Sequence, residues 1–564
     1  MKLEDLKAQG EAPAWLENTG FKTLLGGYLL PNETPRGMWR RISDDAASAL
    51  NRPELADIFF NLFWSSVFCA STPIAVNLGT DRGLPISCFG SNIADQTSEI
   101  LRKASEAGML SKYGGGTAGY FGNIRPSGSV ISKGGTTDGP VAFMKIFDSV
   151  ISTISQGSTR RGSFAAYLPI DHPDVAAFLR MRRPEGDPNR QCLNLHHAVC
   201  ISDEFMQKAL SGDEKSQELL TEVYRARLET GEPYLFFSDN VNNHRPQVYA
   251  DKGLEIQHSQ LCNEIYLNTD STHTFVCCLM SLNLATYHSW KDSDAIYYAI
   301  WFLDAVMTRF LEKAKGLNGL EDAIRFAERE RALGLGVLGW HTLLQTEGVS
   351  MDSLRAKILN KAIFKKIKEE SVRASKDLAV AYGEPSLLKG YGLRNSALNC
   401  VAPTASNSLI SGNVSAGIEP ISSNCYEKAT AKGSFVEFNP TLKLLLAQKG
   451  KDIPEIWNQI LKDEGSVRSL DCLSAEEKNV FKTAFEIDQR VLVNLAADRQ
   501  PFIDQGQSLN LFFPSNTDPL YFHEVHVSAW KQKLKGLYYV RSSSVLKADL
   551  SARGSVECTV ACEG

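Results

Sequence analysis

Short apolar segments alternate with longer amphipathic segments from about residue 71 onward, a pattern typical of α/β proteins. The apolar runs at 164–169, 197–201 and 275–284 are predicted strands. The stretches 295–310 and 357–382 are predicted helices, because their apolar residues recur at helical spacing. We therefore expect an α/β fold.

Three other segments carry local signals of their own. Residues 1–70 are predicted to be mostly helical, with a section that glycine and proline interrupt. Ser474 and Glu477 form a capping box, which predicts a helix running toward Ile487. Residues 541–564 are rich in serine and poor in large apolar residues, so a flexible tail is expected there.

Composition and charge exclude several classes of protein. The 564 residues are 43% hydrophobic and 22% charged, which is ordinary for a globular protein. The net charge of −5 predicts no general attraction to nucleic acid or to an anionic membrane. The N-terminus lacks the apolar core of a signal peptide, and the apolar stretch 58–70 is too short to span a bilayer. We expect a soluble cytoplasmic protein with neither nucleic acid nor membrane as a partner.

Three glycine-rich or hydroxyl-rich segments could bind phosphate. Residues 334–339 match the dinucleotide pattern GxGxxG, but a charged helical stretch precedes them where a Rossmann fold needs a strand. Residues 402–408 and 156–162 could hold a phosphate or a base through backbone amides, hydroxyls and arginines. Taken alone, each of these two segments is more often a plain surface loop.

The twelve cysteines are too few for a disulfide scaffold, and most should be buried. In an extended segment Gln260, Cys262 and Glu264 would point the same way and place an amide, a thiol and a carboxylate on one face. A carboxylate raises the pKa of a neighbouring thiol, which disfavours ionic chemistry, but a radical role needs no thiolate. From this motif alone, a buried cysteine beside a salt-bridged glutamate is the simpler interpretation.

Other cysteines are also candidates. Cys277 and Cys278 are adjacent in a predicted strand and face opposite sides, and the apolar pattern does not choose between them. Cys558 and Cys562 lie close together in the tail, which has no further zinc ligand. Thiol–disulfide exchange is therefore the better chemical interpretation of this pair, with an inert chain end as the alternative.

These motifs, in this order, resemble the large subunit of class I (aerobic) ribonucleotide reductases. The resemblance runs from about Leu55 to the C-terminus and rests on Ser87–Cys88, 261–265, Cys277, 403–406, 413–420, 502–505, Tyr538–Tyr539 and the terminal cysteine pair. It implies a ten-stranded α/β barrel over 71–540 with the radical cysteine on a loop inside. A helical region, 1–70, would precede the barrel, and a redox-active tail, 541–564, would follow it.

The resemblance assigns roles to the residues around the substrate. Cys262 would form a thiyl radical that removes the 3′ hydrogen of a ribonucleoside diphosphate, and Glu264 would take the 3′-hydroxyl proton. Gln260 stands where the family has asparagine. Cys88 and Cys277 would supply the reducing equivalents, and the family spacing before Ser281 selects Cys277 over Cys278.

The resemblance also implies partners. Cys558 and Cys562 would reduce the Cys88–Cys277 disulfide and be recharged by thioredoxin or glutaredoxin. Tyr538 and Tyr539 match a stacked pair that carries the radical from a separate, metal-bearing small subunit. This chain itself would then hold neither metal nor cofactor.

Nucleotide sites follow from the same resemblance. The substrate contacts would be Thr72, Ser87, Thr404, Ala405, Ser406 and Asn407. An allosteric deoxynucleoside triphosphate or ATP would bind at a homodimer interface through Asp95, Gln96, Thr97, Lys112, Arg125, Ser132 and Lys133. The loop that contains Gln156, Arg160 and Arg161 would transmit the identity of the bound effector to the site that holds the substrate base. The first 50 residues leave no room for the family's N-terminal ATP-cone, so we expect no dATP inhibition through such a domain.

Two other functions remain open at this point. The chain could be an adenosylcobalamin-dependent (class II) reductase, which the tyrosine pair disfavours. It could also be an inactive nucleotide-binding regulator, although sequence drift would not be expected to retain all five functional cysteines. The diphosphate form of the substrate is implied only by the family.

Overall fold

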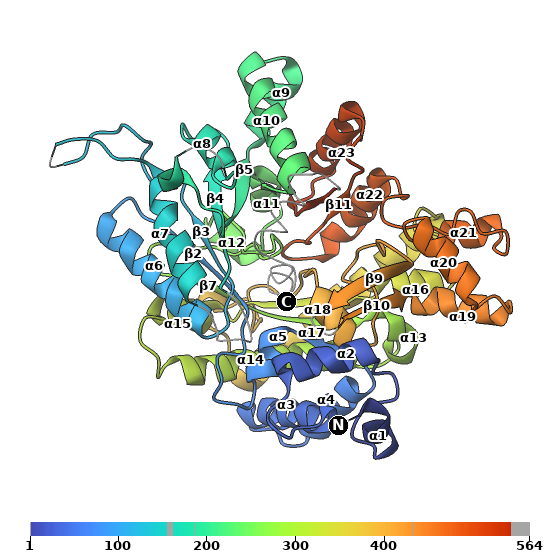
Figure 1. The fold of residues 1–564 in the computed structure, drawn as a ribbon. Coiled ribbons are helices and arrows are strands. Elements are labelled where there is room, and N and C mark those ends of the chain that lie inside the picture. The colour runs from blue at the N-terminus through green and yellow to red at the C-terminus, as the bar shows by residue number, and fades with distance from the viewer. Residues whose placement is uncertain (1, 133, 155–161, 185–186, 431–432, 543–564) are drawn as a thin grey trace.

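The computed structural model describes the whole chain except residues 1, 133, 155–161, 185–186, 431–432 and 543–564. At its centre lies a nine-stranded sheet that helices surround (Figure 1). The strands of this sheet are β1 (Phe68–Ala70), β2 (Cys88–Asn92), β3 (Thr117–Tyr120), β4 (Phe164–Pro169), β5 (His196–Ile201), β6 (Tyr234–Phe237), β7 (Phe275–Asn283), β8 (Leu333–Leu338) and β12 (Gly536–Leu537). The predicted α/β architecture is confirmed.

The sheet contains two groups of parallel strands, and the two groups run in opposite directions where they meet. Strands β2 to β6 are parallel neighbours in chain order, β7 and β8 are parallel to each other, and β7 pairs with β2 antiparallel. Single bridges from Leu335 to Asn399 and from Val401 to Gln507 continue the second half. Because the segments at 399–401 and 507 make only such bridges, the described residues form nine strands of the main sheet where the resemblance implies ten.

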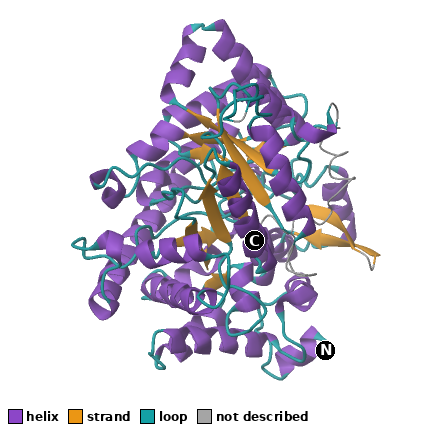
Figure 2. Cartoon of the chain, turned by 90° about the vertical axis from the view of Figure 1, so that its left-hand side faces the viewer, coloured by secondary structure: helices purple, strands orange, loops and turns teal. Residues whose placement is uncertain are grey.

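Helices cover the outside of this sheet, as Figure 2 shows in a second view. The N-terminal group is α1 (Leu3–Ala8), α2 (Asn18–Thr23), α3 (Pro35–Ala49), α4 (Leu55–Trp64) and α5 (Thr72–Asn77). The next group is α6 (Thr97–Lys112), α7 (Pro140–Thr153), α8 (Val175–Arg180), α9 (Asp203–Ser211), α10 (Glu214–Thr230), α11 (Ser238–Asn243) and α12 (Gln247–Asp251). The later helices are α13 (Tyr287–Trp290), α14 (Ala295–Ala314), α15 (Glu321–Glu330), α16 (Trp340–Thr346), α17 (Leu354–Tyr382), α18 (Ala405–Ile410), α22 (Gln489–Arg499) and α23 (Pro519–Lys531).

A separate hairpin forms a second, smaller core. Strands β9 (Cys425–Thr430) and β10 (Gly433–Phe438) pair only with each other and stand apart from the main sheet (Figure 2). Helices α19 (Pro440–Gln448), α20 (Pro454–Lys462) and α21 (Ala475–Val480) follow the hairpin in the chain. Leu442, Trp457 and Ile460 are among the buried side chains of this second core.

Most predicted elements agree with the observed ones to within a few residues. Strand β4 has its predicted bounds, β5 begins one residue earlier, and the two long helices extend beyond theirs. The capping box of Ser474 and Glu477 is confirmed, but α21 ends at Val480 and does not continue toward Ile487. The carbonyl of Phe481 accepts a bond from Asn424, and Ala484 N donates to Ile421, so tertiary bonds replace helical ones. Within the described part of the chain, no helix is long and apolar enough to cross a membrane.

Candidate active site

Cys88 and Cys277 face each other across two neighbouring strands. The antiparallel register of β2 and β7 places them directly opposite, where side chains point to the same face with Cα atoms about 4.5–5.5 Å apart. This separation lies within the range that a disulfide spans. Cys278 is the next residue of β7, so its side chain points to the opposite face of the sheet. The register thus puts Cys277, and not Cys278, opposite Cys88.

The segment around Cys262 is a turn and not the extended segment that we assumed from the sequence. Asn263 has a φ of 59°, in the left-handed region that asparagine tolerates better than most residues. Its Nδ2 donates to the carbonyls of Leu235, at 3.0 Å, and Leu537, at 3.1 Å. The loop is therefore anchored to both strands of the β6–β12 pair.

Gln260 connects this loop to the cysteine pair. Its side-chain oxygen accepts a bond from the Cys262 N–H, and its Nε2 donates to the Sγ of Cys88 over 3.6 Å. The Gln260 side chain also acts to lower the pKa of the Glu264 carboxyl group, against the larger effect of burial. Gln260 therefore links the turn at Cys262 to Cys88.

Glu264 is an almost completely buried carboxyl group. Burial raises its pKa to about 8, against the bonds from Ser508 and Gln260 that favour the charged form. Ser508 Oγ lies 3.1 Å from Glu264 Oε2 and donates to the Cys262 carbonyl at 2.6 Å. A carboxyl group whose pKa lies near neutrality suits proton transfer, so Glu264 is a candidate general base.

The sequence did not single out Ser508 or Cys400, which the fold brings to this site. Burial raises the pKa values of Cys277 and Cys400 well above the usual range, so both thiols stay protonated. A Cβ at Gly334 would come within 2.6 Å of Cys400 Sγ and 3.3 Å of Cys277 Sγ. This glycine of the GxGxxG string therefore makes room for thiols, and it lies in strand β8 and not in a nucleotide-binding turn.

Tyr538 and Tyr539 lie between β12 and β13 (Val540–Arg541), which pairs with β11 (Leu511–Phe512). Their ring centroids are 4.3 Å apart, and the ring planes are tilted by 55°, so the contact is close without being a parallel stack. Tyr538 is buried and Tyr539 is partly exposed. The pair thus leads from the surface toward Leu537, whose carbonyl anchors the Cys262 loop.

Gly536, next to this pair, leaves no space for a side chain. A Cβ there would lie 2.6 Å from the carbonyl of Leu235 and 2.7 Å from Nδ2 of Asn263. We expect Gly536→Ala to lower the free energy of unfolding by about 1–3 kcal/mol, because the backbone or the anchor of the loop must move. Chemical denaturation measures this. Gly26→Ala is the control, since a Cβ at Gly26 meets nothing within 4 Å; equal effects of the two changes would contradict the expectation.

The predicted substrate residues come from separate segments of the chain, and one of them, Ala405, lines a cavity. Thr404 has a φ of 55° and precedes α18, while its Oγ1 accepts a bond from Gly417 N at 2.7 Å. Ala405 lines a cavity of about 640 Å³ together with Asn413, Ser415 and Arg541. Thr72 begins α5, and its hydroxyl lies 2.8 Å from that of Tyr28.

The predicted effector residues are only partly brought together. Asp95 accepts a bond from Arg125 Nε at 2.6 Å, and Gln96 and Thr97 open α6. Lys112 ends the same helix, about 22 Å away along its axis. Ser132 lies in the irregular segment between β3 and α7. Lys133 and the predicted specificity-loop residues Gln156, Arg160 and Arg161 lie outside the described residues, as do Cys558 and Cys562.

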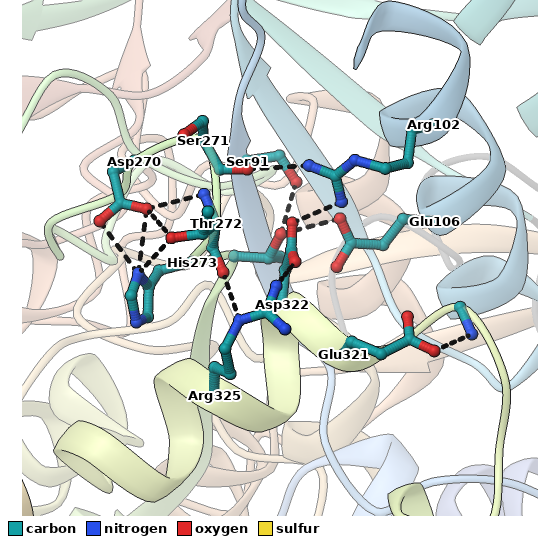
Figure 3. A network of polar contacts seen from close by, with 12 residues as sticks. Ser91, Arg102, Glu106, Asp270, Ser271, Thr272, His273, Glu321, Asp322 and Arg325 are labelled. Carbon is teal, nitrogen blue, oxygen red and sulfur yellow. Dashed lines mark hydrogen bonds and ion pairs between the residues drawn. The ribbon is translucent and has the colours of Figure 1, made fainter. Parts of the chain in front are cut away.

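A buried polar network, which the sequence did not suggest, fixes α6 to the sheet (Figure 3). Lys103 Nζ, on α6, pairs with Glu106 at 2.9 Å and also with Asp322 of α15. Thr274 Oγ1 accepts from Lys103 at 2.8 Å, and Arg102 donates to Asp322 at 2.7 Å. Because these charges are paired and hydrogen-bonded, they set the position of the helix that Asp95 precedes.

Comparison with known proteins agrees with this geometry. The family model for the ribonucleotide reductase barrel domain matches residues 86–216, 211–387 and 385–540, and the all-alpha-domain model matches residues 14–83. The ribonucleoside-diphosphate reductase large subunit of Invertebrate iridescent virus 3 is 35% identical over 543 residues, 83% of this chain and 85% of that protein. The large chain of Schizosaccharomyces pombe is 29% identical over 621 residues, 94% of this chain and 74% of that one.

A solved structure is similar over nearly the whole chain. The class Id ribonucleotide reductase alpha subunit of Actinobacillus ureae is 42% identical and superimposes with a TM-score of 0.88, covering 95% of this chain and 99% of that chain. The matched sequence families, the full-length relatives and the shared fold lead to one conclusion: this chain belongs to the ribonucleotide reductase large-subunit family.

Proposed function

We propose that this chain is the catalytic subunit of a class I ribonucleoside-diphosphate reductase and that its chemistry takes place between Cys262, Glu264, Cys88 and Cys277. One observation carries this assignment. Two thiols lie directly opposite each other on β2 and β7, and Gln260 connects them to the buried loop that bears a third thiol and a carboxyl group.

The reaction uses these four groups in sequence. A thiyl radical on Cys262 removes the 3′ hydrogen atom of the ribose, and Glu264 takes the proton of the 3′-hydroxyl. The 2′-hydroxyl leaves as water, while Cys88 and Cys277 give up two protons and two electrons and end as a disulfide. Return of the 3′ hydrogen from Cys262 regenerates the radical. Protonated thiols suit this chemistry, since hydrogen-atom transfer uses the S–H bond and not the thiolate.

The radical would come from a separate, metal-bearing small subunit through Tyr539 and then Tyr538. The partly exposed Tyr539 faces the side from which a partner could deliver an oxidising equivalent, and Tyr538 continues the route inward. Thr72, Ser87 and residues 404–407 would hold the substrate, and Asp95 with Arg125 would form part of an effector site in a homodimer. The enzyme would act in the cytoplasm, or in the host cytoplasm if the chain is viral.

Reduction of CDP and ADP by the purified full chain, with dithiothreitol and an effector, tests this function. We expect activity only when a small subunit from the same source is added. Activity with adenosylcobalamin alone would overturn the tyrosine route and favour a class II reductase. Inactivity under both conditions, with effector still bound, would favour the regulator.

The tail cysteines would return the Cys88–Cys277 pair to the reduced state. We expect Cys558→Ser to block turnover with thioredoxin as the reductant, because exchange needs both tail thiols. Partial turnover with dithiothreitol should remain, since a small dithiol can reach the barrel directly. Initial rates with the two reductants measure this, and full activity with thioredoxin would refute the shuttle.

A further inference from the structure

A buried polar cluster lies behind the hydroxyl group of Tyr539. The Nδ1 of His196, on β5, is 3.2 Å from that hydroxyl and 2.7 Å from Oε1 of Glu232. Arg182 forms an ion pair with the same carboxylate oxygen. The side chains of His196 and Glu232 are only 7% and 2% exposed, so this nitrogen lies between the phenol and the carboxylate and largely apart from solvent.

Several contacts hold Glu232 in place in its charged form. Its second oxygen accepts from the backbone N of His197 at 3.1 Å and lies 3.0 Å from the Nδ1 of the same residue. Burial raises the pKa of Glu232, but Arg182 and His196 outweigh it and hold the pKa well below the usual range. An ionised carboxylate on one side of an imidazole stabilises the protonated ring, so the pair is suited to accept a proton from its other neighbour.

The ability of the pair to accept a proton matters when Tyr539 is oxidised. A phenol that loses one electron becomes strongly acidic and must release its proton to a group within hydrogen-bond reach. The described groups that face Tyr539 include the Arg541 guanidinium, 4.8 Å from its ring centre, and the ring of Tyr234, at 5.0 Å. Arg182, whose Nη1 lies 3.3 Å from His196 Nδ1, is a further group near Tyr539. Both arginines are cations and Tyr234 is itself a phenol, so among these described contacts the His196–Glu232 pair is the one suited to accept a proton.

We propose that the His196–Glu232 pair accepts the phenolic proton of Tyr539 when the radical passes through this residue. The inference rests on the proposed function and adds the proton partner of its outer tyrosine. One electron leaves Tyr539 for the oxidant of the small subunit, and the O–H bond breaks as the proton forms an N–H bond at Nδ1 of His196, whose neutral ring carries its hydrogen on Nε2. When Tyr539 takes an electron from Tyr538, the proton returns and the O–H bond re-forms. Arg182 keeps the pair from retaining the proton.

The next residue of the strand provides a matched control. His197 points to the other face of β5, where its ring packs edge-on against Phe178 with centroids 5.4 Å apart. It also bonds Glu232, but through the other carboxylate oxygen. A change at His197 therefore disturbs the same carboxylate and leaves the contact between His196 and Tyr539 in place.

The test compares His196→Asn with His197→Asn in the full chain with its small subunit. We expect His196→Asn to lower turnover roughly 10²-fold and to change the solvent deuterium isotope effect, because asparagine fills the same position without accepting a proton. His197→Asn should stay within a few-fold of the unaltered chain. Unchanged turnover and isotope effect in His196→Asn would overturn the proposal, and so would equal losses in the two variants.

A second measurement begins with the unaltered cluster. With 3-aminotyrosine at position 539, the trapped radical in deuterated buffer should show an exchangeable deuteron hydrogen-bonded to its oxygen, seen by electron–nuclear double resonance. This coupling should disappear in His196→Asn. If the unaltered cluster shows no such deuteron, or if His196→Asn retains it, the proposal fails. Inactivity of the unaltered chain with its small subunit would instead overturn the proposed function, and this inference with it.

Discussion

Cys262→Ser is expected to reduce nucleotide reduction to background. A serine hydroxyl fits the same buried turn, but its O–H bond is too strong to exchange a hydrogen atom with the ribose, so no radical forms on the substrate. Rates of CDP reduction with small subunit, effector and dithiothreitol measure the loss. Effector binding should be unchanged, because Asp95, which precedes α6, and its partner Arg125, which follows β3, belong to other segments than this turn.

Cys192→Ser is the matched control for this change. Cys192 is also a buried free thiol whose pKa burial raises to about 12, but it packs beside Val141 of α7. The control should keep its activity apart from a modest loss of stability. Multiple turnovers by Cys262→Ser, or an equal loss in Cys192→Ser, would refute the radical role of Cys262.

Glu264→Gln is expected to lower kcat/KM by about 10²–10⁴, the usual contribution of a positioned general base. Since the pKa of Glu264 is about 8 in the folded chain, the base form grows as pH rises through that value. The part of kcat/KM that depends on Glu264 should therefore increase from pH 6 to 9, and the glutamine variant should lose this dependence. A pH–rate profile of the two proteins tests both statements.

Glu264→Gln is also expected to change how the free energy of unfolding depends on pH. The pKa of Glu264 is raised above the usual value of 4.5, so between these values the folded chain binds more protons than the unfolded one, and its stability falls as pH rises from about 4.5 to about 8. Glu264→Gln should remove this dependence. Glu330→Gln is the control, because burial also raises the pKa of Glu330, in a cluster with Tyr249 and Ser396. It should alter the stability profile and leave activity intact, whereas loss of activity in both variants would count against a specific role of Glu264.

The sequence predicted the elements whose signals are local. Strand β4 and helices α14 and α17 follow from runs and spacing of apolar residues, and the capping box at Ser474 follows from two residues three positions apart. The end of α21 could not be predicted in this way, because it depends on bonds from Phe481 and Ala484 to Asn424 and Ile421 across the chain.

The candidate site shows the same division. The order of Cys88, Cys262, Glu264 and Cys277 led to the family, but the assumption of an extended segment at 260–264 was wrong because Asn263 adopts a left-handed conformation. The apolar pattern did not choose between Cys277 and Cys278; the resemblance selected Cys277, and the strand register places it opposite Cys88. Ser508, Cys400 and His196 carry no motif, and only long-range packing brings them beside Glu264, Cys277 and Tyr539.

The position of the Cys88–Cys277 pair has a mechanical consequence. These residues lie 189 positions apart, on the two strands where the oppositely directed halves of the sheet meet. A disulfide between them would link the two halves covalently and lower the conformational entropy of the unfolded chain. In the chain-entropy treatment this stabilises the folded form by about 5 kcal/mol. Each catalytic cycle would thus form and then break a covalent link between β2 and β7. Before its reductant acts, the oxidised enzyme would therefore resist unfolding more strongly than the reduced enzyme.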